Sequence, residues 1–203
     1  MGSVILEITA SLDGFITGPN DSVDQPLGEG GERLHDWIFG GQDERSGTAP
    51  RGSATGANRR ILDEMFATMG AVVMRRRWFD HGERPWGDNP PFQVPVFVLT
   101  HRARETLVKG ATSFTFVPDG IESAVRQARA ARGGKNVVVG GAETARPCLK
   151  AGLLDEVHLH MALMFLGRGG RLFENLDGAH VKLAPIRVIE APDVTHLQYR
   201  VIR

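Results

Sequence analysis

The sequence contains a single cysteine, Cys148, which excludes an intrachain disulfide and a zinc site built from several cysteines. No apolar run comes near the about 18 residues that a membrane-spanning helix needs. The first residues have neither the basic segment nor the long apolar stretch of a signal peptide, so we expect a cytoplasmic protein. Lys and Arg number 24, as do Asp and Glu, so bulk attraction to nucleic acid or to acidic membranes is not expected.

What remains is a chain of 203 residues with 41% hydrophobic content, enough for one well-packed domain. We therefore expect a single domain over residues 1–203. Residues 19–57 are rich in glycine and polar residues and indicate a loop insertion, interrupted by a short amphipathic piece at 33–39. Long loops in compact domains are usually functional or mobile. For residues 40–57 a disordered tether and a lid that orders on ligand binding both remain open.

The order of elements predicts an α/β fold. Strands and helices alternate through the middle of the chain, and the end is β-only, which favours a mixed, mainly parallel sheet with helices on both faces and a C-terminal antiparallel strand pair. The expected strands are 4–8, 71–74, 94–100, 114–117, 136–139, 156–165, 181–189 and 194–202. The expected helices are 58–69, 120–132 and 142–151, and the segment 85–91 is expected to be a proline-rich loop.

A glycine pair, Gly140-Gly141, lies between an apolar strand and the start of a helix. Free backbone N–H groups and the helix dipole at such a point attract phosphate, and glycine lets a ligand approach the backbone. A plain tight turn between strand and helix is the alternative. The pattern is not the GxGxxG fingerprint, so an ordinary Rossmann site is not indicated.

Two other strand ends carry groups that suit a nucleotide. The guanidinium groups of residues 75–77 can bind a phosphate, and Trp78 can stack on adenine, although a solvated charge run is the plainer interpretation. Thr100, His101 and Arg102 follow the next strand. Ligands of open α/β sheets bind beyond the carboxyl ends of strands. These strand ends together therefore favour a ligand-binding site more strongly than any one of them does.

His158 and His160 lie two residues apart in a predicted strand, so their side chains point to the same face, where two histidines can share a metal. No third ligand is evident from spacing, so hydrogen-bonded histidines are the preferred interpretation and no metal site is predicted. The chain has no Gly-x-Ser-x-Gly elbow, and Cys148 falls within a helical pattern, so a nucleophilic hydrolase is poorly supported.

Six segments occur in the order of a known family: 11–16 (SLDGFI), 72–77 (VVMRRR), 99–100 (LT), 139–143 (VGGAE), 153–157 (LLDEV) and 166–173 (LGRGGRLF). With them the chain resembles the dihydrofolate reductase-like family that includes the C-terminal reductase domain of the riboflavin-biosynthesis deaminase/reductase. The resemblance spans nearly the whole chain and is thin between about residues 20 and 57. It implies a dihydrofolate reductase-like fold, NADPH as hydride donor, a small-molecule substrate and a homodimer.

The resemblance also implies roles for individual residues. It places Arg76, Arg77 and Trp78 near the 2′-phosphate and Thr100, His101 and Arg102 beside the adenosine. It places Gly140, Gly141, Ala142, Glu143 and Thr144 at the pyrophosphate and nicotinamide, and Thr9, Ala10 and Ile16 around the nicotinamide ring. The resemblance implies a catalytic carboxylate in a region that holds Glu29, Glu32 and Asp36 without choosing among them, and we predict Asp36 because it lies beside Trp37. Asp13 is expected to bond nearby backbone in a turn. The family usually has glycine where Arg75 stands and a small hydroxyl residue where Trp78 stands.

The predicted activity is hydride transfer from NADPH to a C=N or C=O of a small heterocyclic substrate, with a carboxylic acid or ordered water as the proton donor. A narrower hypothesis is reduction of a ribosylamino-pyrimidine phosphate in riboflavin synthesis, with Arg33, Arg45 and Arg51 as candidate phosphate ligands. Two non-enzymatic hypotheses are a nucleotide-binding protein without chemistry and a scaffold whose old site Arg75 and Trp78 have closed. The deaminase zinc pattern is absent from the sequence, so the bifunctional enzyme is not expected.

Overall fold

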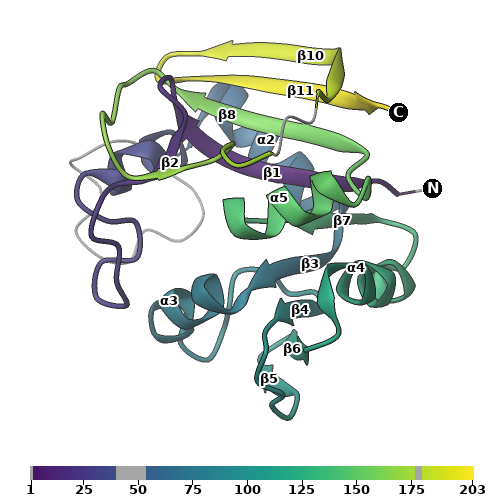
Figure 1. Ribbon diagram of the computed structural model, residues 1–203. Helices are drawn as coiled ribbons and strands as arrows, with labels where there is room; N and C mark the ends of the chain where they lie inside the picture. Colours follow the sequence, from purple (N-terminus) through teal and green to yellow (C-terminus); the bar gives the residue numbers. More distant parts are fainter. Residues whose placement is uncertain (1, 40–53, 177–179) are drawn as a thin grey trace.

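The computed structural model describes residues 2–39, 54–176 and 180–203, and within them a nine-stranded sheet organises the chain (Figure 1). The strand order is β10-β11-β8-β1-β7-β3-β4-β6-β5. The strands are β1 (Val4–Ser11), β3 (Met69–Arg75), β4 (Val96–Leu99), β5 (Leu107–Lys109), β6 (Thr112–Val117), β7 (Asn136–Val139), β8 (Glu156–Ala162), β10 (Lys182–Ala191) and β11 (Val194–Ile202). A separate pair joins β2 (Phe15–Thr17) to β9 (Gly170–Arg171).

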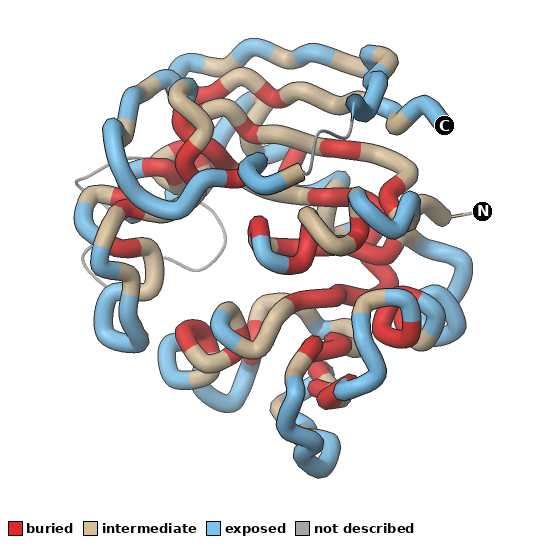
Figure 2. Tube along the Cα trace, in the orientation of Figure 1, coloured by how far each residue is buried: buried red, intermediate tan, exposed pale blue. Residues whose placement is uncertain are grey.

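The sheet is parallel in its centre and antiparallel at both edges. The pairs β8–β1, β1–β7, β7–β3, β3–β4 and β4–β6 are parallel, whereas β10–β11, β11–β8 and β5–β6 are antiparallel. The central strands β3 and β7 are mostly apolar and buried on both faces, as parallel strands between helices must be (Figure 2).

Helices cover both faces of this centre. In β3, Ala71 and Val73 join the core that packs under α4 (Gly120–Ala131) and α5 (Ala142–Lys150), while Val72 and Met74 join the opposite core. That second core includes residues of α2 (Gly56–Thr68) and α3 (Arg76–Trp86). Two short helical turns, η1 (Gly31–His35) and α1 (Asp36–Phe39), precede α2. The predicted fold class is confirmed.

The structure corrects two predicted boundaries and adds one short strand. The sequence predicts a loop over residues 85–91, but α3 continues through Pro85 to Trp86. The buried Phe79 ring and the partly buried Trp86 ring both pack on Phe114 and stabilise the helix, and a proline removes only one of its hydrogen bonds. The strand expected to reach Phe165 ends at Ala162. The short edge strand β5 has too few residues for its alternation to be recognised in the sequence.

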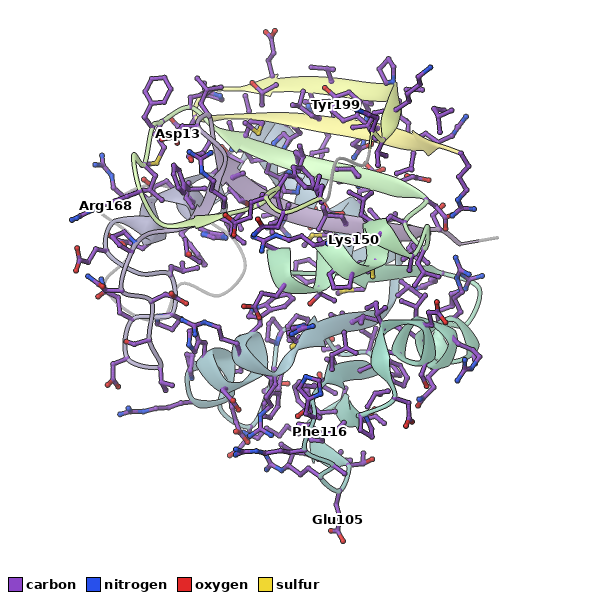
Figure 3. All side chains as sticks on the ribbon, viewed as in Figure 1. Asp13, Glu105, Phe116, Lys150, Arg168 and Tyr199 are labelled. Carbon is purple, nitrogen blue, oxygen red and sulfur yellow. The ribbon has the colours of Figure 1, made fainter. Side chains whose placement is uncertain are left out.

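Asp13 does more than shape the predicted turn, which the Gly14 N–H closes on the Ser11 carbonyl at 2.9 Å. Its carboxylate accepts hydrogen bonds from the backbone N–H groups of Leu166 (3.0 Å) and Gly167 (2.7 Å), far along the chain (Figure 3). Burial would raise the pKa of this carboxyl, but the bonds from Ser11 and these amides outweigh that effect and lower it to about 2. Asp13 therefore connects the 11–14 turn to the loop that leads into β9.

Candidate active site

A cavity of about 560 Å³ opens where β1, β7 and β3 end at their carboxyl termini. Two groups of residues in its lining matter most. The glycine wall consists of Arg75, Trp78 and Gly140–Thr144. The histidine wall consists of Glu7, Thr9, His35, Trp37 and His160. Leu62, Met65 and Phe66 of α2 add an apolar surface, so the cavity combines a few polar groups with hydrophobic lining, as small-molecule sites do.

Buried polar atoms without a hydrogen-bond partner lie in residues that line the cavity. Among the described residues these atoms are His35 Nδ1, Arg75 Nε and Thr144 Oγ1, and all three residues line the cavity. A buried donor or acceptor without a hydrogen bond costs about 1–3 kcal/mol, so native proteins rarely leave one without a ligand, water or functional reason. Three such atoms around one cavity make it the candidate site for a polar ligand.

The glycine wall has the features expected of a phosphate site. Strand β7 runs into Gly140, and α5 begins at Ala142 after Gly141, which has a φ of 81° and open space where a Cβ would lie. The first N–H groups of a helix are free to bind an anion, and the buried Thr144 hydroxyl belongs to this first turn. A pyrophosphate could therefore come close to the Gly141 backbone and to the Thr144 hydroxyl.

Trp78 covers the other glycine of the pair. A Cβ built on Gly140 would lie 1.9 Å from Cζ3 of the Trp78 ring, so the indole rests directly on the Gly140 backbone. The ring is held in place by Phe92, whose centroid is 6.1 Å away. Gly140 is thus required for packing, while Gly141 keeps its open approach.

Changing Gly140 to alanine is expected to destabilise the protein by about 1–3 kcal/mol, since the added methyl group must displace the Trp78 ring. Chemical denaturation followed by circular dichroism measures this change. In the Trp78→Ala background the same substitution should cost less than about 1 kcal/mol, since the obstructing ring is gone. Equal costs in both backgrounds would show that the indole does not occupy this space.

The three arginines after β3 differ in what their guanidinium groups contact. Arg76 pairs with Asp80 at 2.6 Å and does not line the cavity. Arg77 lines it but is paired with Asp21 at 2.7 Å. Arg75 lines the cavity with its buried Nε unpartnered among the described residues. The family resemblance places the phosphate at Arg76 and Arg77, whereas the geometry favours Arg75.

The remaining predicted site residues divide between the cavity and other positions. Thr9, Ile16, Trp78 and residues 140–144 line it. Ala10 is buried next to it without lining it, and Thr100 turns its hydroxyl to the backbone N–H of Arg102 at 3.1 Å, with His101 and Arg102 exposed. Asp36 opens α1 and is not among the lining residues, although its neighbours His35 and Trp37 are. The roles given to these residues stay predictions.

The histidine wall is part of a buried hydrogen-bonded chain. Glu7 Oε1 lies 2.8 Å from His160 Nε2, and Glu7 Oε2 lies 3.1 Å from His158 Nδ1. His160 Nδ1 is 2.7 Å from His196 Nδ1, and the other nitrogen of His196 is 2.9 Å from the Asn58 amide oxygen. Burial alone would raise the pKa of Glu7, but the two histidines outweigh burial and lower it to about 2.

Within the histidine wall, Trp37 packs its ring against two histidines and bonds to Thr9. Its ring lies 4.6 Å from that of His160 and 5.0 Å from that of His196, and its N–H donates to the Thr9 hydroxyl at 3.2 Å. The pairing of the strands places these residues side by side. Strands β1 and β8 pair Glu7 with His158 and Thr9 with His160, and strands β8 and β11 pair His160 with His196. The alternation of two histidines is visible in the sequence, but nothing in it shows that Glu7, from a strand about 150 residues earlier, lies beside them.

His35 and His196 make the fold sensitive to mild acid. Burial and the charge of His160 lower the pKa of each to about 4 from 6.5. The unfolded chain then binds more protons than the folded one between pH 6.5 and 4, so stability should fall by several kcal/mol as the pH drops through this window. Urea denaturation at pH 7, 6, 5 and 4 measures the loss. A double variant, His35→Asn with His196→Asn, that keeps the full slope would contradict it.

The family model of the RibD C-terminal domain matches residues 2–194. The chain belongs to this family. In structure it is similar to a protein assigned to riboflavin biosynthesis from Shewanella sp. PV-4, with a TM-score of 0.73, 22% identity and 99% of each chain covered. It is also similar to a pyrimidine reductase-like protein from Corynebacterium diphtheriae, with a TM-score of 0.60, 14% identity, and 100% of this chain and 92% of that one covered.

A third similar structure is a diaminohydroxyphosphoribosylaminopyrimidine deaminase/5-amino-6-(5-phosphoribosylamino)uracil reductase from Thermotoga maritima. Its TM-score is 0.60 at 14% identity, and the match covers 99% of this chain but 57% of the Thermotoga one. The comparison with curated proteins gave no significant match. Family membership confirms the resemblance found in the sequence and the expectation of a reductase. Among the described residues, no helix is both long and apolar enough to cross a membrane.

Proposed function

We propose that this reductase uses NADPH to transfer a hydride to a C=N or C=O group of a small heterocyclic substrate. The observation that carries the proposal is the convergence of three unpartnered buried polar atoms, among the described residues, on one cavity, two of them in the glycine wall. A cavity of this volume, at the carboxyl ends of parallel strands and beside a helix N-terminus, suits a nucleotide.

The residues present fit the cofactor. Gly141 and Thr144 would hold its pyrophosphate at the start of α5, and Arg75 would bind the 2′-phosphate that distinguishes NADPH from NADH. The Trp78 indole, against Gly140, offers an aromatic surface in the same wall. When bound, the nicotinamide supplies the hydride, and the protein excludes water and orients the substrate.

The family and the histidine wall support the proposed substrate class. The Thermotoga relative is described as a reductase of 5-amino-6-(5-phosphoribosylamino)uracil, and we propose the same ribosylamino-pyrimidine phosphate as the first substrate to test. His35 lines the cavity, and its buried Nδ1 is unpartnered among the described residues, so it would be available to bond a polar atom of a heterocycle. Its low pKa keeps this ring neutral at pH 7.

The test is turnover of that pyrimidine with NADPH deuterated at C4 of the nicotinamide, followed by mass spectrometry of the product. We expect deuterium to be transferred to carbon at a rate well above that without protein. The Thr144→Val variant, which keeps the side-chain volume and removes the hydroxyl, should raise the KM for NADPH. Binding of NADPH without any deuterium transfer would contradict the proposed substrate class.

A nucleotide-binding protein without chemistry is the second candidate, favoured by the Trp78 ring over Gly140. It would bind NADP⁺ and NADPH equally well and show no turnover with any of a panel of cyclic imines, ketones and pyrimidines. The reductase proposal expects turnover of at least one member of the same panel.

We also propose a cytoplasmic homodimer that packs through the uncovered face of β8, β11 and β10. In Figures 1 and 3 no helix lies in front of these strands, and Tyr199 lies on this part of the sheet. The residues in register there include Leu159, Leu197 and Val188, and Val188 is 55% exposed. An isologous contact would place this apolar patch against its own copy. Light scattering should give a dimer mass for the natural chain and a monomer mass for Val188→Glu; a monomeric natural chain would contradict the proposal.

A further inference from the structure

We propose that the part of the cavity between α2 and the sheet is a pocket for a fused aromatic ring of the substrate, so that the enzyme prefers a neutral heterocycle that carries such a ring. The inference rests on the proposed function, because it assigns the glycine wall to the cofactor and this part of the cavity to the substrate. The apolar pocket is formed by six residues of the cavity lining: Leu62, Met65, Phe66, Met69, Val72 and Val138.

The apolar pocket lies where two hydrophobic clusters of the protein meet. Met69, Val72 and Val138 belong to one cluster, and Leu62 belongs to the other. Phe66 of α2 packs against both clusters. Because Met69 begins β3, the cavity follows this strand from its carboxyl end back to its first residue, along the face on which Phe66 packs. The four cluster residues are buried, so the pocket reaches into the hydrophobic core.

The glycine wall and the apolar pocket belong to opposite sides of the sheet. Helix α5, which supplies Ala142 and Thr144 to the glycine wall, lies in front of the sheet in Figure 1, and α2 lies behind it. Along β3, Val73 joins the core under α4 and α5, whereas its neighbour Val72 joins the core on which α2 packs. A cofactor held by the glycine wall therefore leaves the apolar pocket to the substrate.

The chemistry of the apolar pocket suits an aromatic ring. None of its six side chains carries an N–H group, an O–H group or a charge. A water molecule inside a protein needs about two to four polar partners, so water is a poor occupant of such a space, whereas apolar cavities bind aromatic compounds. The thioethers of Met65 and Met69 favour an aromatic ring in particular, because sulfur makes favourable contacts with ring edges and the methionine side chain adapts to the shape of its neighbour.

The polar groups of the cavity limit what can be joined to that ring. His35 lines the cavity, its Nδ1 is unpartnered among the described residues, and burial lowers its pKa to about 4, so the imidazole is neutral at pH 7. A neutral imidazole can bond an uncharged polar atom of a heterocycle. A phosphate does not suit the apolar pocket, since an anion buried without a cation is unfavourable. The sugar phosphate of the pyrimidine proposed above would therefore lie outside this pocket.

The first test needs neither cofactor nor turnover. Quinoxalinone and pyrazinone are neutral cyclic amides with a C=N bond that differ by one fused benzene ring, and each is titrated into the natural chain carrying carbon-13 in its methionine methyl groups. The ring current of quinoxalinone should shift the NMR signals of Met65 and Met69, which Met→Leu variants assign. The signals of Met74 and Met161, outside the cavity lining, should stay unchanged. Quinoxalinone should bind at least tenfold more tightly than pyrazinone. Equal affinities, or no shift at Met65 and Met69, would overturn the proposal.

The second test fills the apolar pocket. Met65 is half-buried and lines the cavity, so Met65→Trp would place an indole in the pocket. Ala67→Trp adds the same ring at an exposed position of α2 and is the matched control. We expect Met65→Trp to weaken quinoxalinone binding at least tenfold, with NADPH affinity changed less than threefold, and Ala67→Trp to match the natural chain in both. Undiminished quinoxalinone binding by a folded Met65→Trp variant would contradict the proposal.

Turnover separates this inference from the proposed function. The hydride of NADPH goes to the carbon of the quinoxalinone C=N bond, the π electrons move to nitrogen, and nitrogen takes a proton from solvent, which gives dihydroquinoxalinone and NADP⁺. We expect kcat/KM to be at least tenfold higher for quinoxalinone than for pyrazinone. Shifted Met65 and Met69 signals without turnover of either compound would support the pocket and count against hydride transfer. Turnover of both compounds with equal kcat/KM would support the reductase and overturn the pocket.

Discussion

Replacing Glu7 with alanine is expected to lower the free energy of unfolding by about 3–5 kcal/mol at pH 7, one of the largest losses available to a single substitution in this protein. Glu7 is buried between His158 and His160 and accepts a hydrogen bond from each. Removing the carboxylate leaves the buried rings of His158 and His160 without the acceptor that they share. Urea denaturation monitored by circular dichroism measures the loss, and it should shrink at high pH once His158, whose pKa its carboxylate partners raise, loses its proton.

Two variants control for volume and for position. Glu7→Gln keeps the shape and one acceptor, so it should cost less than Glu7→Ala while still removing the charge. Glu190→Ala, on the exposed side of β10, should change stability by less than about 0.5 kcal/mol. A Glu7→Ala variant as stable as the natural chain would show that the buried charges do not interact as the distances indicate.

Replacing Arg75 with alanine is expected to weaken NADPH binding about 10- to 100-fold and NADH binding much less. A hydrogen bond to a charged group contributes about 1.5–3 kcal/mol, and each tenfold in affinity corresponds to about 1.4 kcal/mol. The Arg75 Nε is buried in the cavity wall without a partner among the described residues, so a bound phosphate would be its first ionic contact there. Nicotinamide fluorescence during titration gives both affinities.

Neighbouring arginines provide the matched comparison. Arg76→Ala should change NADPH affinity less than threefold, since its guanidinium is held by Asp80 outside the cavity. Arg59→Ala, exposed on α2 and paired with Asp63, should have no effect. A larger loss in Arg76→Ala than in Arg75→Ala would restore the assignment implied by the family resemblance and contradict the one made from the geometry.

Much of the fold could be predicted from sequence patterns. The buried β-branched runs of β3 and β7 are too apolar for any place except the centre of a parallel sheet, and the glycines after β7 mark the start of α5. The helix α3 could not be predicted because its first residues, Arg76, Arg77 and Trp78, show no simple apolar stripe. Its stability comes from Phe79 packing on Phe114 and Phe116, which are contacts between distant segments.

The sequence predicts only those parts of the site whose residues lie within one continuous segment. Gly141 and Thr144 act through a local strand-to-helix turn, so their sequence pattern is sufficient to place them at the cavity. The choice among Arg75, Arg76 and Arg77 depends on partners, Asp80 and Asp21, and on which guanidinium the fold turns toward the cavity. Glu7 meets its histidines through strand pairing across the sheet, and no spacing within the sequence indicates that.

Binding of NADPH in the cavity at the ends of β1, β7 and β3 is the property on which the proposed function depends most. The most direct test is a fluorescence titration of the natural chain with NADPH and, separately, with NADH. We predict micromolar binding of NADPH, weaker binding of NADH, and loss of the difference in Arg75→Ala. Absence of binding of either nucleotide at millimolar concentration would contradict the proposed function and would mean that the Trp78 ring over Gly140 closes the site.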